Sequence, residues 1–206
     1  MLSMATATLL ALSAVVPAPG AADSDHPGPP ISVSVVATIG SGCRNVFVMV
    51  GEDNESFTTA FGRFIAEVGG ATGPTLARES CRLHLQIVLP KGYTYGVARA
   101  TYNGYVHVEP GATATHKADF HFQGQVGTAK VESRFAGPLT DEWQAEYASD
   151  PREIAYLPCG ESRNLITNAE LRADLGTSDP ARWSMISADY VDAPAHAEYR
   201  LAIKTC

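Results

Sequence analysis

The sequence predicts an all-β protein, a single antiparallel β-sandwich domain with two disulfides that follows a signal peptide. Three observations lead to this prediction. Apolar and polar residues alternate along most of the chain, and Gly and Pro separate about ten short runs of this kind. Four cysteines are spread widely through a chain that begins with an apolar segment. Alternation with a period of two is typical of strands that bury one face.

The N-terminus has the layout of a secretory signal peptide. The apolar run Ala5–Val16 is too short to span a bilayer, and the small residues after it suit cleavage near Gly20–Ala22. The segment before the run lacks Lys and Arg, which departs from the usual pattern. We expect secretion to the extracellular space, with residues 1–22 as signal peptide, 23–30 as a Pro-rich leader and 31–206 as the β-sandwich domain. The alternative is a cytosolic protein with an Ala-rich head.

Composition excludes several classes of partner. The chain has 206 residues, a net charge of -7 and only 15 Lys and Arg residues, which form no cluster. Binding to nucleic acid or to an anionic membrane surface depends on such clusters, so we expect neither partner. The sequence predicts no cofactor, and it leaves the oligomeric state open.

The four cysteines predict two disulfides. Cys43, Cys81, Cys159 and Cys206 include no C-x-x-C pair, whereas zinc sites and thioredoxin-like sites use closely spaced pairs. Four cysteines allow three pairings, and we expect the sequential one, Cys43–Cys81 with Cys159–Cys206. On the chain-entropy estimate each bond would contribute roughly 4 kcal/mol. A cysteine at the last position is then a staple on a terminal strand.

The expected strands follow one another with short breaks. The strongest is Cys81–Leu89, where all five odd positions are apolar, and Pro90–Gly92 then makes a turn. Asn103-Gly104 is the strongest hairpin signal and predicts two strands within 93–111. The other strands are expected within 31–39, 45–50, 56–68, 112–124, 129–138, 141–149, 164–175, 182–191 and 197–206. Residues 73–80 invite one helical turn, and 168–175 could form helix or strand.

The loop Pro158–Asn164, with the sequence PCGESRN, holds a cysteine and a serine that could suggest a nucleophile. Ser162 follows a Gly-x-Ser pattern but lacks the second glycine of a nucleophile elbow and a clear strand-to-helix context. Cys159 is expected to form a disulfide with Cys206 and would then not be a free nucleophile. We therefore interpret the loop as framework and predict no catalytic residue.

Histidines and aromatic residues supply the candidate binding sites. His107, Asp119 and His121 lie on the polar phase of their strands and could form a metal site if the strands are neighbours, although solvated histidines are the commoner case. Exposed aromatic rings could stack on sugars, while buried ones would pack in the core. The candidate ligand-binding aromatics are Tyr93, Tyr95, Tyr102, Tyr105 and Trp143.

Acidic residues give weaker signals. Asp141 and Glu142 could serve a glycosidase, which needs two carboxyl groups at a set separation. The segment 51–56, GEDNES, resembles a calcium loop but lacks its alternating ligands, so a solvated turn is favoured. Asn54 begins an N-x-S acceptor sequence for N-glycosylation.

Several segments resemble one known family. Ala77–Gly124, with its Cys-x-Leu-x-Leu strand before Pro-x-Gly, its Tyr-x-Gly-Tyr stretch and its Phe-Gln-Gly end, is similar to the domain-of-unknown-function family 4360, as are Pro158–Arg172 and Cys206. The family comprises secreted four-cysteine proteins of filamentous bacteria and fungi. The resemblance extends over roughly Thr38–Cys206 and implies export, one domain and paired cysteines. It implies no activity and no catalytic residue.

These observations together favour a secreted binding or envelope-associated protein without catalysis, whose partner is an extracellular glycan or a cell-wall component. The alternative is a secreted hydrolase that acts on polysaccharide or peptide, with the Asp141 and Glu142 pair or the His107 and His121 face as its site.

Overall fold

The computed structural model describes residues 28–70, 73–74, 76–126, 129–188 and 196–206, which form twelve β-strands. Within this described part no helix occurs, and so none that is long and apolar enough to cross a membrane. The all-β prediction is confirmed. The strands are β1 (Ser32–Ile39), β2 (Phe47–Val50), β3 (Ser56–Ala60), β4 (Ile65–Gly69), β5 (Leu76–Val88), β6 (Tyr93–Val108), β7 (Thr113–Phe122), β8 (Ala129–Ala136), β9 (Leu139–Ala148), β10 (Leu165–Asp174), β11 (Trp183–Ser187) and β12 (His196–Thr205).

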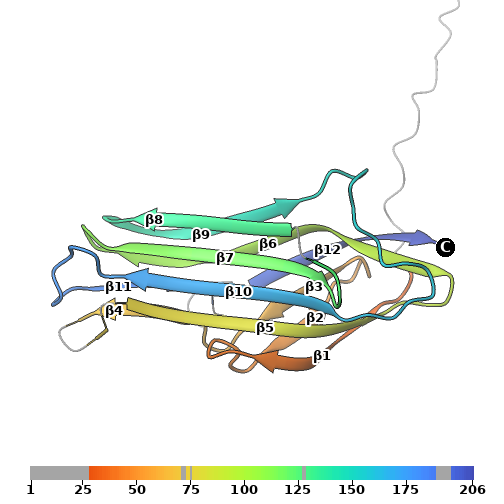
Figure 1. Cartoon of the computed structure of the whole chain (residues 1–206), viewed down its shortest axis with the longest axis horizontal. Helices are drawn as coiled ribbons and strands as arrows, with labels where there is room; N and C mark the ends of the chain where they lie inside the picture. The colour runs from red at the N-terminus through yellow and green to blue at the C-terminus, as the bar shows by residue number, and fades with distance from the viewer. Residues whose placement is uncertain (1–27, 71–72, 75, 127–128, 189–195) are drawn as a thin grey trace, which may run out of the picture.

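The strands form two antiparallel sheets packed as a sandwich (Figure 1). One sheet has five strands in the order β1-β5-β10-β7-β8. The other has seven strands and is built around the long β6. Strands β12 and β11 follow one another along one edge of β6, and β9 lies along the opposite edge. Strands β3 and β2 continue the sheet beyond β12, and β4 continues it beyond β11.

The core lies between the sheets because each strand turns its apolar phase inward. Strand β5 buries Cys81, Leu83, Leu85 and Ile87, as its alternation predicts. From the opposite sheet, β6 and β12 contribute aromatic rings, and Phe57 stacks on Tyr199 with ring centroids 4.9 Å apart. Burial of this apolar surface is the main stabilising contribution to such a sandwich.

The predicted hairpin at Asn103-Gly104 is wrong, because β6 runs through both residues without a break. Gly104 lies opposite Trp143 on β9, and a Cβ at position 104 would overlap the Ser187 carbonyl oxygen and would lie 2.6 Å from Trp143 Cζ2. The glycine therefore leaves room for the backbone of β11 and for a neighbouring indole ring. Pairing with β9 and β12 along most of β6 outweighs the local turn preference.

The expected helical turn at 73–80 is also wrong, since β5 already begins at Leu76. The ambiguous segment 168–175 belongs largely to β10, which pairs with β5 on one side and β7 on the other. The expected run 56–68 divides into β3 and β4. In each case long-range strand pairing decides the local structure.

Both predicted disulfides are confirmed. The Cys43–Cys81 bond joins residues 38 apart and fixes the β1–β2 loop to β5, while Cys159–Cys206 joins residues 47 apart and fixes the end of the chain. In the loop Pro158–Asn164, Arg163 pairs with Glu161 at 2.6 Å and donates to the Gln123 carbonyl at 3.2 Å. These contacts agree with the interpretation of this loop as framework.

Other expectations lie partly outside the described residues. The predicted signal peptide, residues 1–22, falls there, as does most of the 23–30 leader, so these boundaries stay predictions. The segment 51–56 forms a turn in which the Asp53 carboxylate accepts hydrogen bonds from the Glu55 and Ser56 amides. Burial raises the pKa of Asp53, but these hydrogen bonds and nearby Arg200 outweigh it and lower the pKa overall.

Candidate functional site

The predicted aromatic residues do not form one platform. Tyr95, Tyr102 and Trp143 are buried between the sheets, so their rings are core residues and do not reach a ligand at the surface. Tyr93 remains 38% exposed at the start of β6, and Tyr105 is half-buried on the outer face of the same strand. Burial raises the pKa of Tyr95 and of Tyr102, as expected for hydroxyl groups held in the core.

The three predicted metal ligands are not brought together. His107 faces outward from β6 in the seven-stranded sheet, whereas Asp119 and His121 face outward from β7 in the five-stranded sheet. The polar phase of each strand was correctly predicted, but the two strands belong to different sheets, so these side chains lie on opposite outer faces. No cluster of three or more His, Cys, Asp or Glu side chains able to hold a metal occurs among the described residues.

An exposed tryptophan lies on the outer face of the seven-stranded sheet. Trp183 begins β11 and is 49% exposed. The residue paired with Trp183 on β4 is Gly69, which has no side chain to cover the indole. The positive φ of 77° at this position favours glycine. On the β6 side, the His107 ring lies against the indole with centroids 4.8 Å apart. The sheet thus presents an aromatic ring to solvent and holds it from one side.

Beside this ring, His107 belongs to a series of polar contacts that also includes Glu109, Arg182 and Thr140. Arg182 Nη1 lies 3.1 Å from Glu109 Oε2, and His107 Nε2 lies 3.5 Å from Glu109 Oε1. His107 Nδ1 and Thr140 Oγ1 share a hydrogen bond of 2.7 Å. The Glu109 amide donates to Ser184 Oγ at 3.0 Å, which fixes the backbone of this loop to β11. We call the five surface residues the Trp183 patch: Trp183, His107, Glu109, Thr140 and Arg182.

The Trp183 patch has no clear signal in the sequence, because the run Trp183–Ser187 has apolar residues on both of its phases. Ser184, Ile186 and Ser187 are buried, whereas Trp183 and Met185 lie on the outer face. For Trp143 the signal was present. In β9, Trp143, Ala145 and Tyr147 alternate with charged or amide residues, and this pattern predicts that they face inward.

The outer face of the five-stranded sheet has a different character. Its outward side chains on β5, β10, β7 and β8 form a network of ion pairs and hydrogen bonds, which we call the polar face. Glu170 accepts from Arg78 at 2.7 Å and from Arg172 at 2.8 Å, and Glu132 accepts from Arg134 at 2.7 Å. The charged members are Arg78, Arg82, Lys117, Asp119, Lys130, Glu132, Arg134, Glu170, Arg172 and Asp174.

A hollow of about 600 Å³ opens on the polar face between β1, β5, β10 and β7. It is lined by Arg78, Arg82, Lys117, Asn168 and Glu170, among others. Partial burial raises the pKa of Glu170, but the hydrogen bond and charge of Arg78, with the charges of Arg172 and Lys117, outweigh burial and hold this pKa below its usual value. The carboxylate is therefore held ionised by the cations around it.

These features define a class: a disulfide-bonded all-β sandwich that presents an aromatic patch on one outer face and a charged hollow on the other. The chain belongs to the family described as "Domain of unknown function (DUF4360)", which it matches over residues 29–206. The expected family membership is therefore confirmed.

A curated relative and two solved structures are also similar to the chain. "Uncharacterized secreted protein" of Arthroderma benhamiae is 25% identical over 155 residues, which are 74% of this chain and 62% of that relative. TmCBM61, solved in complex with beta-1,4-galactotriose, is 14% identical over 86% of this chain and 92% of its own, with a TM-score of 0.32. A Broad Bean Stain Virus chain is 5% identical over 70% and 88%, with a TM-score of 0.30. Such low TM-scores do not identify a ligand.

Proposed function

We propose that this protein is a non-catalytic extracellular binding protein that binds a glycan at the Trp183 patch. The observation that carries the proposal is the exposed indole of Trp183, supported by His107 and flanked by the Arg182 and Glu109 pair. Aromatic rings provide a flat apolar surface, and the adjacent charged groups can donate to and accept from sugar hydroxyls. A pyranose ring has both an apolar face and a rim of hydroxyls, so it fits this combination.

The extracellular setting has independent support. Disulfides such as Cys43–Cys81 and Cys159–Cys206 persist in oxidising compartments, and the Arthroderma benhamiae relative carries the word secreted in its name. The protein is secreted, and extracellular or cell-wall glycans are ligands that it can encounter.

The alternative hydrolase function has less support. Asp141 and Glu142 are neighbours on β9, and successive side chains of a strand point to opposite faces, so this pair cannot act across one cleft. His107 and His121 lie on different sheets. Binding without catalysis therefore remains the function that the geometry favours.

The test is an affinity measurement on a panel of neutral plant, fungal and bacterial polysaccharides, first in affinity gels and then by calorimetry. Trp183→Ala should weaken binding to the preferred polysaccharide ~10-fold, because one stacking contact is worth up to about 1.4 kcal/mol. Tyr93→Ala is the matched control, since it also removes an exposed ring from the seven-stranded sheet and should leave the affinity unchanged.

Two results would contradict the proposal. One is a panel on which the wild-type protein binds nothing. The other is a Trp183→Ala variant that binds as tightly as the wild type while Tyr93→Ala loses affinity.

A further inference from the structure

The polar face carries more basic than acidic side chains, although the protein as a whole is acidic. Its outward positions hold six Lys and Arg residues against four Asp and Glu residues, within a chain of net charge -7. This excess of basic side chains arises because two of the carboxylates each form ion pairs with two cations. Glu170 serves both Arg78 and Arg172, and Glu132 serves both Arg134 and Lys117. Each cation therefore keeps donors that its shared partner does not occupy.

Arg82 differs from these arginines. Its Nε donates to the amide oxygen of Asn168 at 2.6 Å, and the Asn168 amide nitrogen donates onward to Asp119 Oδ1 at 2.7 Å. Arg82 forms no ion pair within the described part of the chain, so the amide positions its guanidinium without neutralising it. Arg82 and Arg78 both line the hollow from β5, and four residues of strand separate them by ~13 Å.

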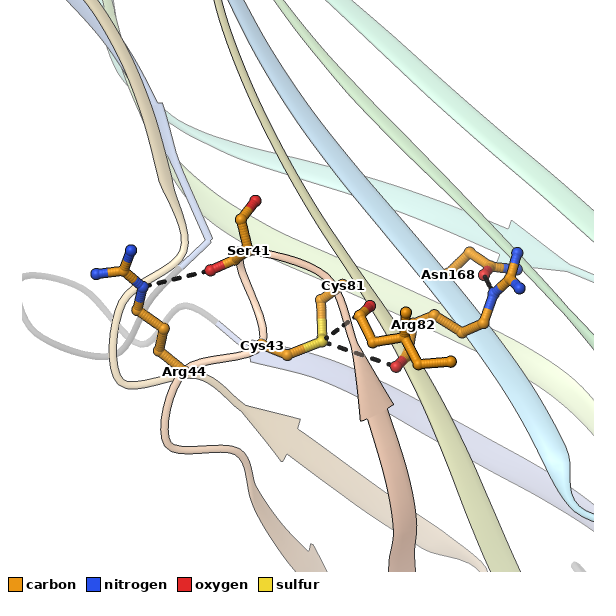
Figure 2. The surroundings of a disulfide bond; sticks show 7 residues. Ser41, Cys43, Arg44, Cys81, Arg82 and Asn168 are labelled. Carbon is orange, nitrogen blue, oxygen red and sulfur yellow. Dashed lines mark hydrogen bonds between the residues drawn. A yellow bond between two sulfur atoms is a disulfide. The ribbon is translucent and has the colours of Figure 1, made fainter.

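The wall of the hollow is fixed by the first disulfide. Figure 2 shows the Cys43–Cys81 bond joining the β1–β2 loop to β5, directly beside Arg82 and its contact with Asn168. Ile39 and Gly40, just before this loop, line the hollow with Cys81. In the same loop the Gly42 amide donates to the Ser80 carbonyl at 3.0 Å. The cations thus stand in a depression whose rim is held covalently.

We propose that the polar face is a second binding surface, specific for glycans that carry carboxylate groups, with Arg78, Arg82 and Lys117 as the residues that contact the anions. Guanidinium groups bind carboxylates through paired hydrogen bonds, which gives both affinity and orientation. The intervening Glu170 and Asp119 accept hydrogen bonds from sugar hydroxyls. A uronic-acid polymer presents carboxylates together with hydroxyls, and a face that holds both cations and carboxylate acceptors can bind both kinds of group.

The same alternation disfavours nucleic acid. A phosphate backbone carries dense negative charge and needs a continuous basic stripe, whereas here carboxylates stand between the cations and repel closely spaced phosphates. A uronate glycan is therefore the partner to which the observations point, and nucleic acid becomes an outcome of the test.

The experiment measures binding of the full secreted protein to polygalacturonate, with dextran and duplex DNA as comparison ligands, at about 50 mM salt, where exposed charges are weakly screened. The wild type should bind polygalacturonate at least ~10-fold more tightly than either comparison ligand. Arg78→Gln/Arg82→Gln should reduce that affinity ~10-fold or more, since charge-assisted contacts are the stronger hydrogen bonds. Lys117→Gln, which changes a single exposed residue, should cause a smaller loss in the same direction.

The matched control is Arg99→Gln/Arg200→Gln on the seven-stranded sheet, which removes two ion-paired arginines and gives the same net charge. This control should bind polygalacturonate as the wild type does. Equal losses in both double variants would show that only net charge matters and would overturn the proposal. So would equal affinity for duplex DNA, or no binding to polygalacturonate. Retention of this binding in Trp183→Ala separates the two proposed sites.

Discussion

The two outer faces of the sandwich carry different kinds of side chain. The five-stranded sheet is covered by a network in which Glu170 and Glu132 each hold two cations. The seven-stranded sheet also carries ion pairs, such as Arg99–Glu146, but it leaves the Trp183 ring open beside Glu109 and Arg182. An exposed ring favours ligands with an apolar face, whereas a network with surplus cations favours anions. The difference indicates that the faces have different ligands.

Both faces rest on one core. His116 projects inward from β7 of the five-stranded sheet and lies between rings of the seven-stranded sheet, with centroids 4.6 Å from Trp143 and 5.1 Å from Tyr102. Its side chain is almost fully buried. The outer faces thus differ, although the two sheets share one packed core. Substitutions in the disulfides and in this core can test whether binding at one face changes without binding at the other.

The largest expected effect comes from the disulfides. Removing either pair, by Cys43→Ala/Cys81→Ala or by Cys159→Ala/Cys206→Ala, should lower the free energy of unfolding by about 4 kcal/mol, because each bond closes a long loop. Urea denaturation measures this loss. The two variants should differ in binding, since only Cys43–Cys81 holds the rim of the hollow.

Polygalacturonate binding should distinguish the two disulfide variants. Cys43→Ala/Cys81→Ala should weaken polygalacturonate binding several-fold and leave binding at the Trp183 patch intact. The other double variant, measured under conditions where both remain folded, is the control and should keep both affinities. If the two variants lose polygalacturonate affinity equally, the first disulfide does not shape the polar face.

The next effect concerns the core that the sheets share. Burial lowers the pKa of His116 to about 4, from the usual value near 6.5. Between about pH 4 and 6.5, His116 therefore binds a proton in the unfolded chain but not in the folded chain. Neutral His116 makes its full contribution to the free energy of unfolding above about pH 6.5. This contribution, up to about 3 kcal/mol, is lost as the pH falls toward 4.

His116→Leu removes this protonation site and places an apolar side chain in the core. The free energy of unfolding should then fall less steeply between pH 6.5 and 4.5 than it does in the wild type, as measured by urea denaturation at each pH. Phe120→Leu, which replaces a buried ring without a titratable group on the same strand, is the control and should keep the wild-type slope. An unchanged slope in His116→Leu would show that other groups take up the proton.

The sequence predicted what depends on local pattern. Alternation correctly predicted the inward phase of β5, and cysteine spacing together with export predicted both disulfides. It did not predict which strands share a sheet, because that depends on contacts far apart in the chain. The local pattern therefore leaves His107 and His121 as possible neighbours, although their strands belong to different sheets. It also predicts a turn at Asn103-Gly104, where Gly104 instead leaves room for the Ser187 carbonyl and for Trp143.

The candidate sites show the same limit. The Trp183 patch combines β6, β9 and β11 with the residues next to them, and the polar face combines four strands of the other sheet. Each residue of these surfaces is ordinary in its local sequence, and only the register brings Arg82, Asn168 and Asp119 into one row. A surface that is assembled by strand order cannot be found before that order is known.

The smallest expected effect is the coupling between the faces. They lie on opposite sides of two packed sheets, whose mean planes in such sandwiches are about 10 Å apart. Distant sites without shared contacts usually act additively within about 0.5 kcal/mol. Saturating the Trp183 patch with its polysaccharide should therefore change the polygalacturonate affinity less than ~2-fold. When Trp183→Ala is combined with Arg78→Gln/Arg82→Gln, each ligand should lose only the affinity that it loses in the variant of its own face.

Calorimetry with one ligand in the presence of the other measures this coupling directly, and short oligosaccharides are the appropriate ligands because a long polymer could reach around the edge of the sandwich. A coupling of five-fold or more between short ligands would contradict the independence of the faces. It would mean that the packing of His116 against Trp143 and Tyr102 transmits a change from one sheet to the other. In that case His116→Leu should abolish the coupling while leaving each separate affinity in place.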